Sequence, residues 1–217
     1  MKIYKPTSAG RRDATVIEYK KYLSSNRSQP VKALTKGKRS TGGRNSQGRT
    51  TQLYRGGGNK RTYRMIDFSY NKKNIEARIE TIEYDPNRTG FIACVLYKDG
   101  ERRYILVPQT LAVGDTFIVS DEARPKVGNR LPLGKIPAGT KIYAVELKPN
   151  GGARIARSAG NYAEVVAQDG AFTLVKLPSS EIRKVTALAW ASIGEVSNEE
   201  NRLVVLGKAG RARHMGL

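Results

Sequence analysis

The sequence predicts a mainly β protein in which two small barrels in tandem lie between two long, basic and irregular extensions. Three observations predict this fold class: positive charge lies at the two ends, short strand patterns separated by turn residues fill the middle, and a Gly/Pro-rich passage divides that middle in two. Short strands at close spacing are typical of small barrels rather than of helical domains. We expect an N-terminal extension over residues 1–60, barrels over 61–125 and 126–200, and a C-terminal extension over 201–217.

Charge is distributed very unevenly along the 217 residues. Residues 1–64 hold 17 Lys and Arg against 2 Asp and Glu, residues 65–201 hold 18 against 17, and residues 202–217 hold 4 against none. The middle can therefore fold as a near-neutral body, whereas the two ends need counter-charge from a partner. Nucleic acid supplies dense and regularly spaced negative charge, so it is the predicted partner.

The first barrel is predicted from alternating apolar residues and one strong hairpin signal. The alternation after Ile75 contains one interruption. Asp99-Gly100 favours a tight hairpin because both residues tolerate positive φ. Strands are predicted over residues 75–84, 91–97, 103–107 and 116–119.

The second barrel repeats this style after the Gly/Pro-rich passage near residues 120–135, where we place the boundary between the barrels. Asp169-Gly170 predicts another hairpin. Ser197 and Glu200 have the spacing of a capping box, which predicts one short helix over residues 198–206. Further strands are predicted over residues 141–147, 162–167, 172–177, 182–185 and 187–193.

The N-terminal extension combines Lys and Arg with Gly, as in residues 36–49 and 55–61. Such a composition cannot bury enough apolar surface to offset the entropy of ordering, so we expect the isolated extension to be largely mobile and to become ordered on a ligand. The glycines of 56–58 allow a close approach to phosphate, and Tyr54 and Tyr63 are available to stack on bases. A disordered linker or solvated tail is the alternative.

The sequence does not indicate catalysis. One cysteine and one histidine leave no Cys/His set for zinc. Cys94 lies in an apolar run and is interpreted as a buried small hydrophobe, since the only candidate base, His214, belongs to the basic tail. Arg61 follows Lys60 where a phosphate-binding loop needs Ser or Thr. We therefore expect no enzyme, no cofactor, no metal and no small-molecule substrate, and no membrane partner because apolar runs are short.

A loop over residues 153–160 places Arg154 and Arg157 beside small residues between two strands, and Arg88 occupies a comparable turn. Arginine can bind a phosphate through two parallel hydrogen bonds, so these residues are candidate phosphate contacts. A solvated turn explains the same residues, and the sequence leaves both interpretations open.

Longer motifs occur along the chain in a fixed order. They are KPTSAGRR (5–12), GGRN (42–45), GGG (56–58), EYDPNR (83–88), YKDGERRYIL (97–106), ARSAG (156–160) and LGKAG (206–210). In this order and spacing they resemble the bacterial-type large ribosomal subunit protein L-two family over all 217 residues. The resemblance implies an OB-like barrel, then an SH3-like barrel, with extensions threaded into large-subunit rRNA near the subunit interface. It also implies roles in large-subunit assembly, subunit association and the architecture around the peptidyl transferase centre, where RNA performs the chemistry.

The expected partners are large-subunit rRNA, other ribosomal proteins and the small subunit, and the expected location is the ribosome in the cytoplasm, with an organellar ribosome left open. The alternative is an RNA-binding translation factor or RNA chaperone built on small β-barrels. Family members usually continue past Gly216 through a second basic, His- and Gly-rich stretch, whose role is not carried over. The candidate RNA-binding residues are Lys5, Arg11, Arg12, Lys38, Arg39, Arg44, Asn45, Arg49, Arg55, Gly56, Gly57, Gly58, Lys60, Arg61, Arg64, Arg88, Arg154, Arg157, Lys208, Arg211, Arg213 and His214.

Overall fold

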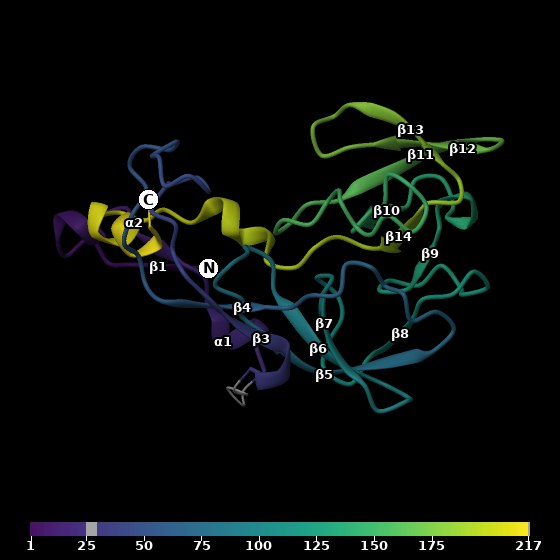
Figure 1. Cartoon of the computed structure of the whole chain (residues 1–217), viewed down its shortest axis with the longest axis horizontal. Coiled ribbons are helices and arrows are strands. Elements are labelled where there is room, and N and C mark those ends of the chain that lie inside the picture. Colours follow the sequence, from purple (N-terminus) through teal and green to yellow (C-terminus); the bar gives the residue numbers. More distant parts are fainter. Residues whose placement is uncertain (25–29, 217) are drawn as a thin grey trace.

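The protein is mainly β, as predicted, and its computed structural model describes residues 1–24 and 30–216. The predicted N-terminal extension includes residues 25–29 and the predicted C-terminal extension includes residue 217, which lie outside the described residues. Figure 1 shows the two largest sheets on one side of the molecule and both chain ends on the other. Within the described ranges, no helix is long and apolar enough to cross a membrane.

The first large sheet has the strand order β7-β6-β5-β8 and is antiparallel throughout. The predicted Asp99-Gly100 hairpin joins β6 to β7, and Gly100 takes the positive φ of 85° that this turn requires. The interruption in the apolar alternation is a register shift between Ile79 and Thr81. The strands are β5 (Glu76–Glu83), β6 (Ile92–Tyr97), β7 (Arg102–Leu106) and β8 (Thr116–Ile118).

The second large sheet has the order β13-β12-β11-β10-β14-β9. The Asp169-Gly170 hairpin joins β11 to β12, as predicted. One strand, β9, was not predicted, because it lies in the passage interpreted as a boundary. The strands are β9 (Arg130–Pro132), β10 (Lys141–Tyr143), β11 (Ala163–Asp169), β12 (Phe172–Lys176), β13 (Ile182–Thr186) and β14 (Trp190–Ile193), and a short 3-10 helix, η3 (Leu133–Lys135), follows β9.

Neither large sheet closes into a barrel through the strand pairings of the described residues, in contrast to the closed barrels that the strand spacing predicts. β7 and β8 are the edges of the first sheet, and β13 and β9 are the edges of the second. Among the described residues, one parallel bridge, Ile66 to Tyr104, continues the first sheet beyond β7. An irregular segment therefore lies where a further strand would complete the barrel. The sheets remain consistent with an OB-like and an SH3-like unit.

The two large sheets share one hydrophobic core. Ile79 and Val95 of the first sheet and Ile142 and Val165 of the second are almost fully buried. This shared burial ties the sheets together, since apolar burial is the main favourable term in folding.

Part of the predicted N-terminal extension also packs against the first sheet. Ile17 belongs to the core, and Val31 and Leu34 pack against it. The Val31 N–H donates to the Tyr104 hydroxyl oxygen at 3.1 Å. Removing residues 1–60 would therefore take apolar contacts from the first sheet, so the loop after Lys38 is the part that can be altered independently.

The described part of the predicted N-terminal extension contains short regular elements where irregular structure was predicted, and one of its strands pairs with the first residues of the predicted first barrel. Two antiparallel pairs form, β1 with β2 and β3 with β4. The second pair matches Lys38 with Arg61, so the glycine-rich residues 39–60 form one long loop at its end. The elements are β1 (Lys2–Ile3), η1 (Ala9–Arg11), β2 (Thr15–Val16), α1 (Tyr19–Tyr22), η2 (Lys32–Leu34), β3 (Thr35–Lys38) and β4 (Arg61–Arg64).

The helix predicted over residues 198–206 is wrong in length and in its cap. The chain forms a 3-10 helix, η4 (Glu199–Leu203), and Asn198 precedes it in a left-handed conformation with φ 68°. The Ser197 hydroxyl oxygen accepts a hydrogen bond from the Phe91 N–H at 3.1 Å instead of capping the helix. The tail, predicted to be irregular, forms the helix α2 (Ala209–Met215).

Candidate nucleic-acid interface

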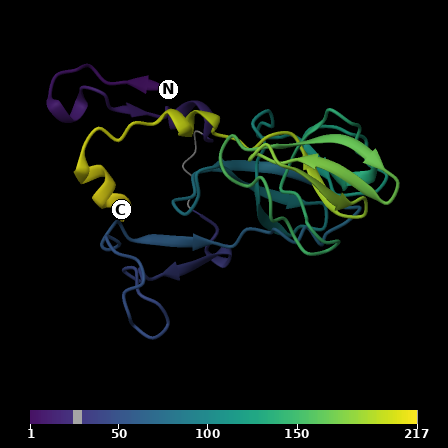
Figure 2. The ribbon, with the colours of Figure 1, turned by 90° about the horizontal axis from the view of Figure 1, so that it is seen from above.

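The two basic ends of the chain lie together in one region. Figure 2 shows the C-terminal segment running from the sheets past the N-terminal strands to the glycine-rich loop. The Thr15 N–H donates to the Val205 carbonyl oxygen at 3.1 Å, and the Asn59 N–H donates to that of His214 at 3.0 Å. The exposed candidate residues in this region are Lys5, Arg11, Arg12, Lys38, Arg39, Arg44, Asn45, Arg49, Arg55, Gly56, Gly57, Gly58, Lys60, Lys208, Arg213 and His214.

The tip of the glycine-rich loop is shaped by Asn45. Its side-chain oxygen accepts hydrogen bonds from the backbone N–H groups of Gln47, at 3.0 Å, and Arg49, at 3.1 Å. Asn45 is therefore a turn-forming residue, and this structural role explains it without an RNA contact. Arg44 and Arg49, on either side of the turn, are exposed.

A second cluster of cations surrounds the Tyr4 ring. Lys2 Nζ, Arg11 Cζ and Arg211 Cζ each lie 5.8 Å from the ring centroid, so Arg211 of α2 reaches an N-terminal residue. Cation–π attraction favours this arrangement. Lys208 lines the same small pocket as Tyr4, Arg11 and Arg211 and adds a further positive charge to the cluster.

Arg64 and Arg88 differ from the other candidates because they share a buried carboxylate. Arg88 Nε lies 2.6 Å from Asp85 Oδ2, and Arg64 Nη1 lies 4.0 Å from Asp85 Oδ1. Asp85 is fully buried. The negative charge of Asp85 offsets one of the two positive charges, so the three side chains together carry one net positive charge. The first role of the two arginines is therefore to provide partners for the buried Asp85 carboxylate.

The loop over residues 153–160 joins this turn through Phe68. Arg88 Cζ and Arg157 Cζ lie 5.5 Å and 4.8 Å from the centroid of the Phe68 ring. The Ala153 N–H donates to the Phe68 carbonyl oxygen at 2.8 Å. No local sequence pattern marks Phe68, because its partners are distant in the chain.

The candidate cations therefore form two groups. One lies on the joined extensions, and the other consists of Arg64, Arg88 and Arg157, with the exposed Arg154 on the same loop as Arg157. Arg61 links them, since its guanidinium donates to the carbonyl oxygens of Pro86, at 3.2 Å, and Met215, at 2.7 Å.

Cys94 belongs to the core rather than to this interface. It lies in β6, and burial raises the pKa of its thiol to about 11, with a further contribution from the Glu80 carboxylate. A thiol held neutral in this way is a weak nucleophile. The interpretation of Cys94 as a buried hydrophobe agrees with this position.

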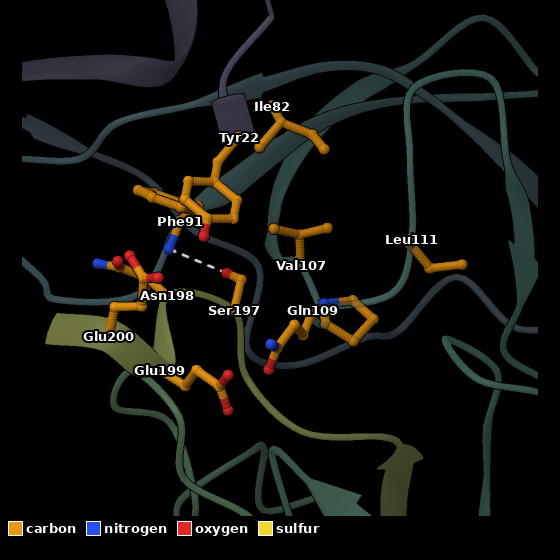
Figure 3. A pocket seen from close by; sticks show the side chains of 11 residues that line it. Tyr22, Ile82, Phe91, Val107, Gln109, Leu111, Ser197, Asn198, Glu199 and Glu200 are labelled. Atoms are coloured by element: carbon orange, nitrogen blue, oxygen red, sulfur yellow. Dashed lines mark hydrogen bonds between the residues drawn. The ribbon is translucent and has the colours of Figure 1, made fainter. Parts of the chain in front are cut away.

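A small cavity of about 50 Å³ lies between the first sheet and the segment before η4. Figure 3 shows Tyr22 and Phe91 on one side of it and Glu199 and Glu200 on the other. The Met1 amino group forms an ion pair with Glu200 at 3.0 Å. Two carboxylates at its wall make this cavity unsuitable for phosphate.

Open antiparallel sheets carrying exposed cations on long extensions define the class of basic, mainly β nucleic-acid-binding proteins. Comparison with known families gives a more specific assignment. Residues 31–120 match the family described as "Ribosomal Proteins L2, RNA binding N-terminal domain", and residues 126–217 match "Ribosomal Proteins L2, C-terminal domain".

Two curated relatives are similar over the entire chain. The chain is 47% identical over 216 residues to the large ribosomal subunit protein uL2 of Granulibacter bethesdensis, covering 77% of that protein. It is 48% identical over 217 residues to the protein of the same name from Roseobacter denitrificans, covering 76% of it. The chain therefore belongs to the ribosomal protein L2 family, as its motifs predict.

Proposed function

We propose that this protein is a structural constituent of the large ribosomal subunit that binds rRNA. The observation that carries the proposal is the joining of two glycine-rich, cationic extensions beside a near-neutral folded body in a chain of the L2 family. Phosphates provide the counter-charge that such extensions need. A free translation factor or RNA chaperone is not favoured by this family membership.

The residues that we propose as RNA contacts are those predicted from the sequence, but the structure gives some of them additional roles within the protein. The exposed cations of the extensions and Arg154 and Arg157 are available to phosphate, whereas Arg61, Arg64 and Arg88 also hold protein groups in place. Asn45 acts through the shape of its loop. Interior A-form RNA offers little base readout to side chains, so recognition should depend on RNA shape and unpaired nucleotides.

The finer roles follow the family resemblance. The protein would act on the ribosome, contact neighbouring ribosomal proteins and the small subunit, and support large-subunit assembly and the architecture around the peptidyl transferase centre. Its part would be structural rather than catalytic, without a cofactor or a small-molecule substrate. The proposed division into an N-terminal extension, two β units and a C-terminal extension separates binding segments from the folded body.

The decisive experiment replaces residues 39–60 by an Asn-Gly turn. Because Lys38 and Arg61 are paired in the ladder, a two-residue turn can close the β3–β4 pair. We expect the variant to keep the thermal unfolding of the wild type but to be lost from large subunits after a high-salt wash. A matched control replaces only the loop cations Arg39, Arg44, Arg49, Arg55 and Lys60 by Gln at unchanged length. Normal stoichiometric recovery of both variants with the subunit would contradict the proposal.

A further inference from the structure

The end of α2 is held by the glycine-rich loop. Beyond the Asn59 hydrogen bond to His214, Arg61 Nη2 donates to the Met215 carbonyl oxygen at 2.7 Å. The last carbonyl groups of a helix have no partner within the helix, and a positive charge near them is stabilising. Asn59 of the glycine-rich loop and Arg61 at the start of β4 thus satisfy carbonyl groups at the end of the C-terminal helix.

The same segment is anchored at its other end on the N-terminal strands. The Val205 N–H donates to Thr15 Oγ1 at 2.8 Å, and that hydroxyl donates to the Leu203 carbonyl oxygen at 3.1 Å. Residues 203–216 therefore connect the β1–β2 pair to the glycine-rich loop, as Figure 2 shows. We call this segment the clasp.

A cavity of about 520 Å³ lies where the clasp meets the loop. No residue that lines it is acidic, and its walls combine glycine backbone with five cationic side chains. Arg39, Arg55 and Lys60 form no ion pair with any described residue of the chain. The cationic lining residues are Lys38, Arg39, Arg55, Lys60 and Arg61.

We propose that the clasp closes the N-terminal extension into a composite site for the sugar-phosphate backbone of RNA, and that binding by the loop depends on this closure. The inference rests on the proposed rRNA-binding function and adds that the two extensions bind as one unit. Open glycine backbone lets a polyanion approach closely, while the unpaired cations neutralise its phosphates. Closure holds these cations on one concave surface, so opening the clasp would disperse them.

Gly58 and Gly57 provide a matched pair of variants. Both have positive φ, +82° and +62°, so alanine strains the backbone at either position. A Cβ at Gly58 would lie 3.1 Å from the Gly216 nitrogen and 3.3 Å from the His214 carbonyl oxygen, whereas a Cβ at Gly57 meets nothing within 4 Å. Gly58→Ala therefore opposes closure, whereas Gly57→Ala adds a comparably strained Cβ to the same cavity wall without meeting the clasp.

The experiment measures binding of the full chain to a transcript of bacterial large-subunit rRNA between 50 and 200 mM salt. We expect Gly58→Ala to bind about tenfold more weakly than Gly57→Ala at 150 mM salt, with a shallower salt dependence. The triple variant Arg39→Ala/Arg55→Ala/Lys60→Ala should lower the magnitude of the salt slope by about 2–3. Amide exchange at residue 59, measured without RNA, should accelerate in Gly58→Ala more than in Gly57→Ala.

The outcomes separate this inference from the proposed function. If the wild type fails to bind the transcript, the proposed function fails. If the wild type binds and the two glycine variants bind equally, whether weakened or not, closure has no part in binding and the inference is overturned. Thermal unfolding of both variants at the wild-type temperature would show that the folded body is intact.

Discussion

Arg130 Nη2 lies 2.9 Å from Glu146 Oε1, and this ion pair is buried, with 1% and 2% of the two side chains exposed. Arg130 also donates to the Ala144 carbonyl oxygen at 2.7 Å, and its guanidinium lies 4.3 Å from the centroid of the Tyr70 ring. The pair therefore joins β9 and the segment after β10 to the irregular segment before β5. It is a structural element of the body rather than an RNA contact.

Breaking this pair should destabilise the protein strongly. We expect Arg130→Met to lower the free energy of unfolding by about 3–5 kcal/mol, because Glu146 is left as an uncompensated buried charge. Arg130→Met/Glu146→Gln should lose less than the two single variants together, because each single variant strands the other partner. Denaturant unfolding of the three variants measures these differences.

The exposed ion pair between Lys135 and Asp121 is the matched control. Its Nζ–Oδ2 distance is 2.7 Å, but both side chains are about half exposed. Lys135→Met should change the free energy of unfolding by only about 0–1 kcal/mol. An equal loss in Arg130→Met and Lys135→Met would show that burial does not set the contribution of the pair.

A second prediction tests whether Arg154 and Arg157, on the loop that packs against Phe68, contribute to RNA binding rather than to the stability of the fold. Arg154→Ala/Arg157→Ala should lower the magnitude of the salt slope of rRNA binding by about 2, if each residue touches a phosphate. Its thermal unfolding should change only slightly, because neither arginine forms an ion pair with a described residue and the cation–π contact of Arg157 with the Phe68 ring contributes only about 0.5–1 kcal/mol. An unchanged slope would mean that the loop is a solvated turn without phosphate contacts, which is the alternative interpretation of its sequence.

Arg88→Ala is the contrasting variant for that test. It removes the 2.6 Å partner of the buried Asp85 and leaves Arg64, at 4.0 Å, as its charged partner among the described residues, beside the Asn87 hydrogen bonds of 2.9 and 3.0 Å. We therefore expect a loss of about 1–3 kcal/mol in the free energy of unfolding, together with weaker binding. Wild-type stability of Arg88→Ala would show that Asp85 does not need this partner.

Much of the fold could be predicted from the sequence, because turns and alternation are local signals. Asp99-Gly100 and Asp169-Gly170 mark hairpins that the structure contains. The break in alternation near Ile79 marks a real register shift. Closure of the barrels could not be predicted in this way, because it depends on which distant segments pair.

The charge count predicts a near-neutral body between two basic extensions, but it could not assign roles to individual cations. Arg130 counts as one positive charge in the sequence, yet its burial beside Glu146 removes it from any interface. Helix caps are equally hard to predict from a local pattern. The Ser197 hydroxyl oxygen, which the pattern assigns to a helix N-terminus, instead accepts a hydrogen bond from the N–H of Phe91, 106 residues away. Long-range partners decide such cases.

A third prediction concerns the reactivity of Cys94. Because burial raises the pKa of its thiol to about 11 from an ordinary 9.0, the folded protein holds about 100-fold less thiolate at pH 8 than the unfolded chain. Ellman's reagent should therefore react at least about 100-fold more slowly with the native protein than in guanidinium chloride. Prompt reaction of the native protein would contradict the buried position of this residue.

The last prediction concerns pH and the Glu80–Arg102 pair. Arg102 Nε lies 2.7 Å from Glu80 Oε2, and this hydrogen bond lowers the pKa of the carboxyl below its ordinary 4.5 in the folded state. The folded protein then binds fewer protons than the unfolded chain near that pH, so this contribution is present above pH 4.5 and is lost as the pH falls through the folded-state pKa.

Glu80→Gln should therefore lower the unfolding temperature at pH 7 but have progressively less effect as the solution is acidified below pH 4.5. The exposed pair of Glu181 and Arg183, with a 3.1 Å Nε–Oε1 distance, supplies the control Glu181→Gln, which should differ little from the wild type at either pH. Thermal unfolding from pH 7 to pH 3 measures both variants. A deficit in Glu80→Gln that stays constant down to pH 3 would mean that the side chain acts through packing and not through its charge.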